Sequence, residues 1–287
     1  MAYARGDSRA PGAAPMTPTA RDGVADHSTR ALKAAAISWF VVAVLGQLMF
    51  VAYVLGFYGR AAARGRFETW NKVLPHGYVP GDRVGNMMVS LHLLFATVVI
   101  FGGALQLIPV VRRLAPAFHR WNGRVYLLSA GMASVAGLLM VWVRGSSGGD
   151  LSQHLAISLN AVLILVFAGL VCHHARARRI DVHRRWAIRL FLAVSGVWFF
   201  RIGLMFWIVV NQGPVGFDPK TFQGPFLTFL SFADFLLPLA VLQLYFHAQG
   251  SKVPARRLAV AAGLFALTLM TGGGIAAASL ILWLPRL

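Results

Sequence analysis

The fold is decided by two related stretches, LHLLFATVVIFGGALQLIPVVRRLAPAFHRWNGRVYLL (residues 91–128) and QHLAISLNAVLILVFAGLVCHHARARRIDVHRRWAIRLFL (residues 153–192). Each opens with a histidine in an apolar run, crosses a basic connection, and starts a second apolar run with His-Arg and an aromatic residue. The paired histidines are His92 and His119, 27 residues apart, and His154 and His183, 29 residues apart. This similarity predicts a duplicated helical hairpin, repeated in the same orientation over about residues 87–143 and 152–210, with a pseudo-twofold axis along the membrane normal.

The composition around these stretches is that of a membrane protein. The chain has 287 residues, of which 57% are hydrophobic and only 13% are charged, whereas soluble domains carry about 25% charged residues. The net charge of +18 comes from arginines scattered between apolar runs, which excludes a soluble nucleic-acid binder. The single cysteine, Cys172, excludes an internal disulfide and CxxC chemistry.

Seven apolar runs follow a polar N-terminal tail, and each is close to the ~20 residues that cross a bilayer. They lie at about 34–57, 87–111, 122–143, 152–172, 187–210, 226–247 and 258–284. The third run extends one turn earlier if Pro116 occupies a first helical position. We therefore expect an all-α, polytopic membrane helix bundle of about seven transmembrane helices over residues 31–287, and a disordered cytoplasmic tail over residues 1–30.

The distribution of basic residues predicts the orientation in the bilayer. With the N-terminus inside, the cytoplasmic segments contain 18 of the 27 Lys and Arg residues and the outer segments contain eight, with Arg201 inside a span. Because short cytoplasmic loops are enriched in Lys and Arg, the N-terminus is expected in the cytoplasm and the C-terminus outside. The first outer loop fits this orientation least well, since it carries five of the eight outer Lys and Arg residues.

The four repeat histidines are the candidate cofactor ligands. Related by the pseudo-twofold axis, His92 faces His154 on the outer side, and His119 faces His183 on the inner side. Histidine pairs on facing helices suit the six-coordinate iron of a b-type haem, so one or two haem b groups are expected. A single Zn²⁺ site is disfavoured, because two histidines leave two ligands unsupplied. The alternative is that these histidines are interfacial residues with structural roles.

Other polar residues fall within the spans. Arg201 lies on the His183 face, near the predicted level of the outer histidines, and Asp234 is at a compatible depth, so an Arg201–Asp234 ion pair is one expectation. The functional alternative is that Arg201 binds a haem propionate or a substrate carboxylate. Gln106 continues the His92 face. Gln47, Asn160 and Ser158 are expected to form hydrogen bonds between helices, and the TGGG segment (271–274) to be a packing or kink site.

Residues 91–201 resemble a family of bacterial predicted membrane proteins, domain of unknown function 2306 (DUF2306). The resemblance is carried by LHLLFATVVIFGGALQLIP, HRWNGRVYLLSA and DVHRRWAIRLFLAVSGVWFFRIGL. The resemblance implies a membrane fold and a location in a bacterial inner membrane, but no established activity. The helix order and histidine placement are also similar to those of dihaem cytochromes b, as an analogy of architecture without a shared motif.

Three functions follow from these patterns. The first is a haem-binding transmembrane electron carrier, with a quinone or another redox partner. The second is a transporter or small-molecule binder with a polar cavity around His92, His154, Arg201 and Asp234. Neither repeat shows an interrupted helix in mid-span, which counts against transport. The third is an accessory membrane protein. All three share the lipid bilayer as partner.

Overall fold

The computed structural model describes residues 20–74, 76–144 and 149–287, and these residues form helices joined by short loops, with no β-strand among them. The α-helices are α1 (Ala20–Tyr53), α2 (Arg60–Ala63), α3 (Arg83–Leu107), α4 (Pro109–Leu114), α5 (Pro116–Leu139), α6 (Leu151–Arg176), α7 (Ile180–Val194), α8 (Gly196–Val210), α9 (Pro225–Gly250) and α10 (Pro254–Ala278). Three π-helical segments, Val54–Gly59, Met140–Arg144 and Ser279–Trp283, extend α1, α5 and α10, and short 3₁₀ turns cover Phe67–Lys72 and Leu284–Arg286.

The prediction of about seven spans agrees with the structure, which has six or seven. Six continuous helices are long and apolar enough to cross a membrane, and the bent pair of α7 and α8 makes a seventh if it is counted as one span. The helix of the third span begins at Pro116, as the proline predicted. The first span extends further than expected, because α1 begins at Ala20. Residues 20–30 of the expected tail are therefore helical, and residues 1–19 lie outside the described residues.

The fifth span is broken in its middle, and the expectation of uninterrupted repeat helices is wrong. The axes of α7 and α8 differ by 50°. Ser195 lies between them, and its side-chain hydroxyl donates to the Phe191 carbonyl at 2.7 Å. Gly196 then starts α8. Sharp bends in helices commonly occur at such Gly/Ser pairs. The Ser195–Gly196 pair is therefore the sequence feature that indicates the bend inside an otherwise apolar run.

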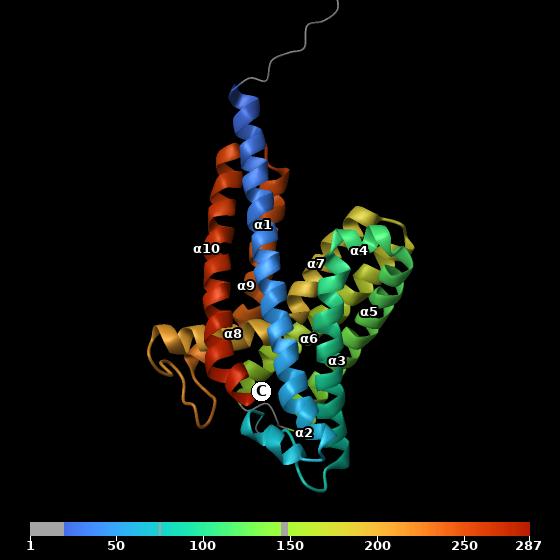
Figure 1. The fold of residues 1–287 in the computed structure, drawn as a ribbon, viewed down its shortest axis with the longest axis vertical. Helices are drawn as coiled ribbons and strands as arrows, with labels where there is room; N and C mark the ends of the chain where they lie inside the picture. The colour runs from blue at the N-terminus through green and yellow to red at the C-terminus, as the bar shows by residue number, and fades with distance from the viewer. Residues whose placement is uncertain (1–19, 75, 145–148) are drawn as a thin grey trace, which may run out of the picture.

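The helices pack as two lobes that separate toward the end of the molecule where α1 begins (Figure 1). The repeat lobe consists of α3, α4, α5, α6 and α7, and the terminal lobe consists of α1, α8, α9 and α10. The lobes meet mainly where α9 contacts α6 and α7, and where α1 contacts α3. Because the break separates α7 from α8, this bent helix pair belongs to both lobes.

The two hairpins of the repeat pack as the sequence predicts. Helix α3 packs closely on α5, and α6 packs closely on α7. Helix α5 also packs on α6, whereas α7 contacts α3 only lightly. Around this four-helix unit, α3 is therefore diagonally opposite α6, and α5 is diagonally opposite α7.

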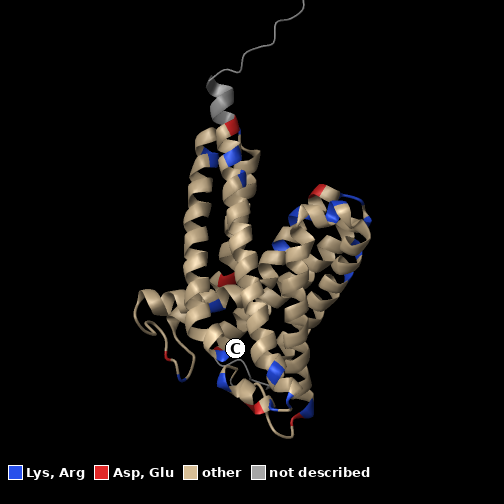
Figure 2. Ribbon diagram, viewed as in Figure 1, with Lys and Arg blue, Asp and Glu red and all other residues tan. Residues whose placement is uncertain are grey.

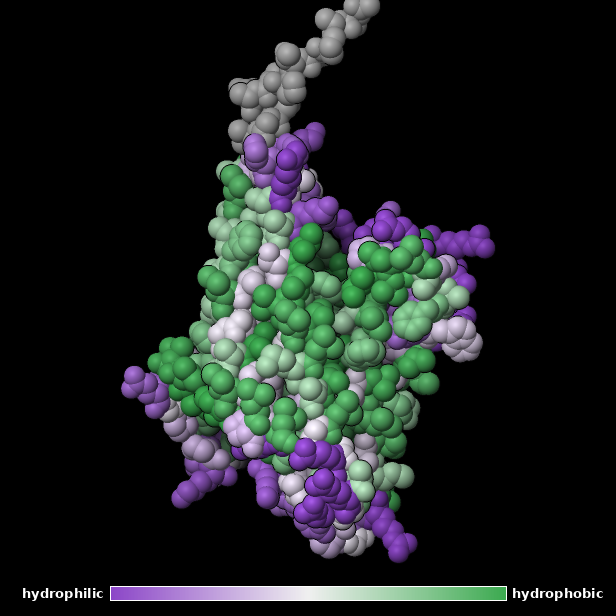
Figure 3. Space-filling view, in the orientation of Figure 1, coloured by the Kyte–Doolittle hydropathy of each residue, from purple (hydrophilic) through white to green (hydrophobic). Residues whose placement is uncertain are grey.

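The surface agrees with a lipid environment. Large apolar side chains are exposed along most of the spans, including Leu128 (67%), Phe229 (64%) and Leu269 (79%). Figure 3 shows apolar residues covering the middle of the visible face, with hydrophilic residues at its two ends. Charged residues follow the same pattern, and few lie between the ends (Figure 2). The chain is a multi-pass membrane protein.

Candidate functional site

His92 lies half-buried on α3 and is oriented by α5. Its Nδ1 atom is 3.0 Å from the Ala133 carbonyl oxygen, which accepts a hydrogen bond when Nδ1 carries the proton. A Cβ atom added to Gly137, one turn further along α5, would lie 3.6 Å from the imidazole. The small residues of α5 thus form the surface on which this ring rests.

His154 lies on α6, beside a different part of α5. Its ring packs edge-on against Trp142, with 6.0 Å between ring centroids, and the Trp142 indole N–H donates to Ser158 at 2.8 Å. Trp142 and Ala133 point to different faces of α5 and its π-helical extension, since they are nine residues apart. The Ala133 contact of His92 and the Trp142 contact of His154 are therefore on different faces of this helix.

His119 and His183 lie at the basic ends of α5 and α7, across the diagonal of the four-helix unit. They are close enough to interact electrostatically. The Nδ1 atom of His183 is 3.0 Å from the Val171 carbonyl oxygen, and Gln106 donates to the His119 carbonyl at 3.0 Å. The Nδ1 atom of His119 is buried and has no hydrogen-bond partner among the described residues.

The small-residue faces of α3 and α5 are filled by neighbouring side chains. A Cβ atom on Gly103 would lie 2.9 Å from the Tyr126 ring and 3.3 Å from the Phe191 ring. Tyr126 is itself buried in a core with Val99 and Leu190. These contacts serve close helix packing.

The expected ion pair between Arg201 and Asp234 is not formed. The Arg201 guanidinium lies over the Phe50 ring, 5.2 Å from its centroid, and donates to the Val197 carbonyl at 3.3 Å. Oδ1 of Asp234 is buried without a hydrogen-bond partner in the described part of the chain. Similar depth in the membrane did not bring the two side chains together, because depth does not fix the direction in which a helix face points.

Asp234 instead lies beside the break in the fifth span. A Cβ atom on Gly196 would lie 2.7 Å from Nδ2 of Asn160 and 3.5 Å from Oδ1 of Asp234. Asn160 donates to the Ala193 carbonyl at 3.1 Å, and Gln47 donates to the Ser195 hydroxyl at 2.9 Å. The predicted roles of Asn160 and Gln47 between helices are confirmed, but the sequence did not show that both converge on one break.

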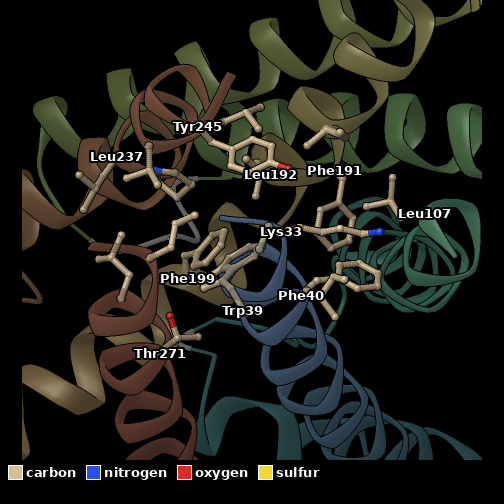
Figure 4. Close-up of a pocket in the computed structure, with 18 of the residues that line it drawn as sticks. Lys33, Trp39, Phe40, Leu107, Phe191, Leu192, Phe199, Leu237, Tyr245 and Thr271 are labelled. Carbon is tan, nitrogen blue, oxygen red and sulfur yellow. The ribbon is translucent and has the colours of Figure 1, made fainter. Parts of the chain in front are cut away.

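A cavity of about 510 Å³ lies between the lobes on the side of the basic ends. Its walls come from both lobes and are mostly apolar and aromatic, and Lys33 is the charged residue in its lining. Figure 4 shows Trp39, Phe40, Phe191 and Phe199 around this space, with Tyr245 and Leu237 of α9 also facing it. Sequence reasoning missed this cavity, because its residues come from seven helices and form no local pattern.

Comparison with known proteins identifies the family. No curated protein and no solved structure matches the chain. The family model described as predicted membrane protein (DUF2306) matches residues 89–237, which is more than half of the chain. The matched region runs from α3 to α9 and contains the four histidines, the broken span and Asp234. The chain therefore belongs to the DUF2306 family of predicted membrane proteins.

Proposed function

We propose that this protein binds a lipophilic anion in the cavity between its lobes, as the first step of moving it through the membrane. The observation that carries the proposal is the cavity itself. Its volume of about 510 Å³ is in the range of small-molecule sites, which are also lined mainly by apolar and aromatic side chains. An occupant that matches these walls is apolar over most of its surface.

The charge at the cavity favours an acidic head group. Lys33 lines it, and basic residues surround the same end of the molecule. Arg185 and Arg189 place their guanidinium groups over Phe246 of α9, at 5.1 and 5.3 Å from the ring centroid. An anion that enters from this end meets positive charge first and apolar walls next.

The broken span gives the lobes a route to relative motion. In many transporters, binding sites lie near discontinuous helices at the middle of the membrane, and one bundle rocks against the other. Here α7 belongs to the repeat lobe and α8 to the terminal lobe, with Ser195 between them. Bending at Ser195 would change the distance between the cavity walls while each lobe keeps its own packing.

A photoactivatable fatty acid tests this proposal, with the corresponding fatty alcohol as the uncharged comparison. We expect the acid to label cavity residues such as Trp39 and Leu237, and excess unlabelled acid to suppress that labelling. Lys33→Gln should lower the apparent affinity about fivefold, because an exposed charge pair contributes about 1 kcal/mol. Lys220→Gln, which changes an exposed lysine remote from the cavity lining, is the matched control.

The proposal fails if labelling of the cavity is not saturable, or if the alcohol labels as well as the acid. It also fails if Lys33→Gln and Lys220→Gln behave alike.

Electron transfer through haem b is the second candidate function, and one observation favours it. His92 and His183 each place Nδ1 at 3.0 Å from a backbone carbonyl, which leaves Nε2 for a metal, the arrangement common in metal-bound histidines. His154 and His119 stand on the diagonally opposite helices. Haem would supply one-electron transfer, with a quinone or another redox partner. The donor set fits haem iron, but Tyr126 and Phe191 occupy the space beside Gly103 where a porphyrin would lie, so we rank this function second.

A reduced-minus-oxidised absorption spectrum of protein produced with ample haem decides this second candidate. A sharp b-type α band that is lost in His92→Ala or His154→Ala would establish it, and His119→Ala would then distinguish one haem from two. A flat spectrum from folded protein would remove it.

A further inference from the structure

The break between α7 and α8 gathers oxygen atoms in the middle of the membrane. The C-terminal carbonyls of a helix have no partners within the helix and form the negative end of its dipole. At the end of α7, the Phe191 carbonyl accepts from Ser195, and the Ala193 carbonyl accepts from Asn160. The break therefore presents the negative end of a half-helix to side chains of α1, α6 and α9.

The side-chain amides of Asn160 and Gln47 form hydrogen bonds at the break through their nitrogen atoms, and not through their oxygen atoms. Asn160 uses its Nδ2 atom to donate to the Ala193 carbonyl, which fixes the orientation of its amide. The Ser195 hydroxyl donates its hydrogen bond to the Phe191 carbonyl, so toward Gln47 it can only accept, from Nε2. Oδ1 of Asn160 and Oε1 of Gln47 are consequently left buried and without a hydrogen-bond partner among the described residues.

Asp234 adds a carboxylate to this set. Its Oδ1 atom is also buried and unpartnered within the described residues. Pro238 lies four residues further along α9 and has no N–H group, so the backbone carbonyl of Asp234 lacks its helical donor as well. Asp234 thus offers oxygen atoms from its side chain and its backbone, and a buried carboxylate without a counter-charge is costly.

We propose that Asp234, Asn160 and the end of α7 bind a monovalent cation of the sodium class at this break. Hard cations take oxygen ligands, and transporters coordinate Na⁺ with unwound carbonyls and the C-terminal ends of half-helices. One carboxylate balances one positive charge, whereas Arg201, the counter-charge expected from the sequence, lies over Phe50. Gln47 reaches the same break from α1 through Ser195.

Gly196 lets Asn160 and Asp234 pack close to the break, because a Cβ atom at this position would lie 2.7 Å from Nδ2 of Asn160 and 3.5 Å from Oδ1 of Asp234. The site is next to the floor of the inter-lobe cavity, because Pro238 lines that cavity one helical turn from Asp234. The inference does not depend on the lipophilic anion, since it rests on oxygens outside the cavity lining.

Thermal unfolding of the purified protein in NaCl, KCl and choline chloride at equal ionic strength tests the site, together with direct binding of ²²Na⁺. We expect NaCl to raise Tm by about 5 °C over choline when Na⁺ is in large excess over Kd. Asp234→Asn, which keeps the shape of the side chain, should abolish both the shift and ²²Na⁺ binding.

Two glycine variants provide a matched comparison. Gly196→Ala places a methyl group against Asn160 and should reduce ²²Na⁺ binding at least tenfold. Gly169→Ala, on the same helix as Asn160, meets no atom within 4 Å and should bind as the wild type does.

Equal Tm values in the three salts would overturn the proposal, as would a sodium shift that survives Asp234→Asn. A stabilisation that depends on pH but not on Na⁺ would also overturn it, and would assign Asp234 a proton instead. Fatty-acid labelling of Asp234→Asn separates this result from the proposed function, because Asp234 is outside the cavity lining.

Discussion

Helices α8 and α10 approach so closely at Gly274 that a single methyl group should separate them. A Cβ atom on Gly274 would lie 2.8 Å from the backbone carbonyl oxygen of Ile202, whereas a carbon–oxygen contact normally needs about 3.3 Å. The clash is with backbone, so rotation of a side chain cannot relieve it. The helices must move apart by about 0.5 Å, and Ile202 packs in a buried core with Trp198 and Ile275.

We therefore predict that Gly274→Ala destabilises the protein, while Gly263→Ala on the same helix does not. Overpacking costs about 1–3 kcal/mol, and alanine recovers up to about 1 kcal/mol of helix propensity. Gly263 meets no atom within 4 Å, so Gly263→Ala gains the propensity alone. The two variants should differ by about 2 kcal/mol, which corresponds to about 4–8 °C in Tm.

Thermal unfolding in one detergent measures this difference, and a fluorescence-detected elution profile checks that each variant is folded. Equal Tm values for the two variants would refute the close approach of α10 to α8. A larger loss in Gly263→Ala than in Gly274→Ala would refute it more strongly.

Further predictions concern the break and the orientation of the chain. Ser195→Ala should lower the free energy of unfolding by about 1–3 kcal/mol, because Nε2 of Gln47 is left buried without its acceptor. Gln47→Leu removes that donor and should lower it less. If chemical unfolding gives the reverse order, the hydrogen bond between Gln47 and Ser195 is contradicted. The orientation is tested with single-cysteine variants in a Cys172→Ser background. With the N-terminus in the cytoplasm, a membrane-impermeant maleimide should label Lys220→Cys in intact cells but not Arg178→Cys. The opposite result would show the inverted orientation.

The sequence was sufficient to predict the spans and the paired hairpins. Apolar runs of the length of a bilayer have few alternatives, since backbone groups in lipid must be satisfied within a helix. The histidine spacing then predicted which helices form hairpins, and α3 with α5 and α6 with α7 pack in this way.

The break and the cavity were not predicted, for physical reasons. Ser195 and Gly196 lie inside a strongly apolar run, where hydropathy alone does not distinguish a straight span from a bent one. Arg201 and Asp234 were paired by depth, but rotation of α8 placed the guanidinium over Phe50. The cavity depends on how two lobes face each other, and no local pattern encodes that arrangement.

The break at Ser195 also divides the two predicted copies of the hairpin unequally. The first copy keeps both arms in the repeat lobe, because α5 continues there along its whole length. The second copy keeps only α7 and gives α8 to the terminal lobe. The two stretches therefore pack alike only as far as Ser195, and residues beyond that point, Arg201 among them, lie in a different lobe from the end of α5.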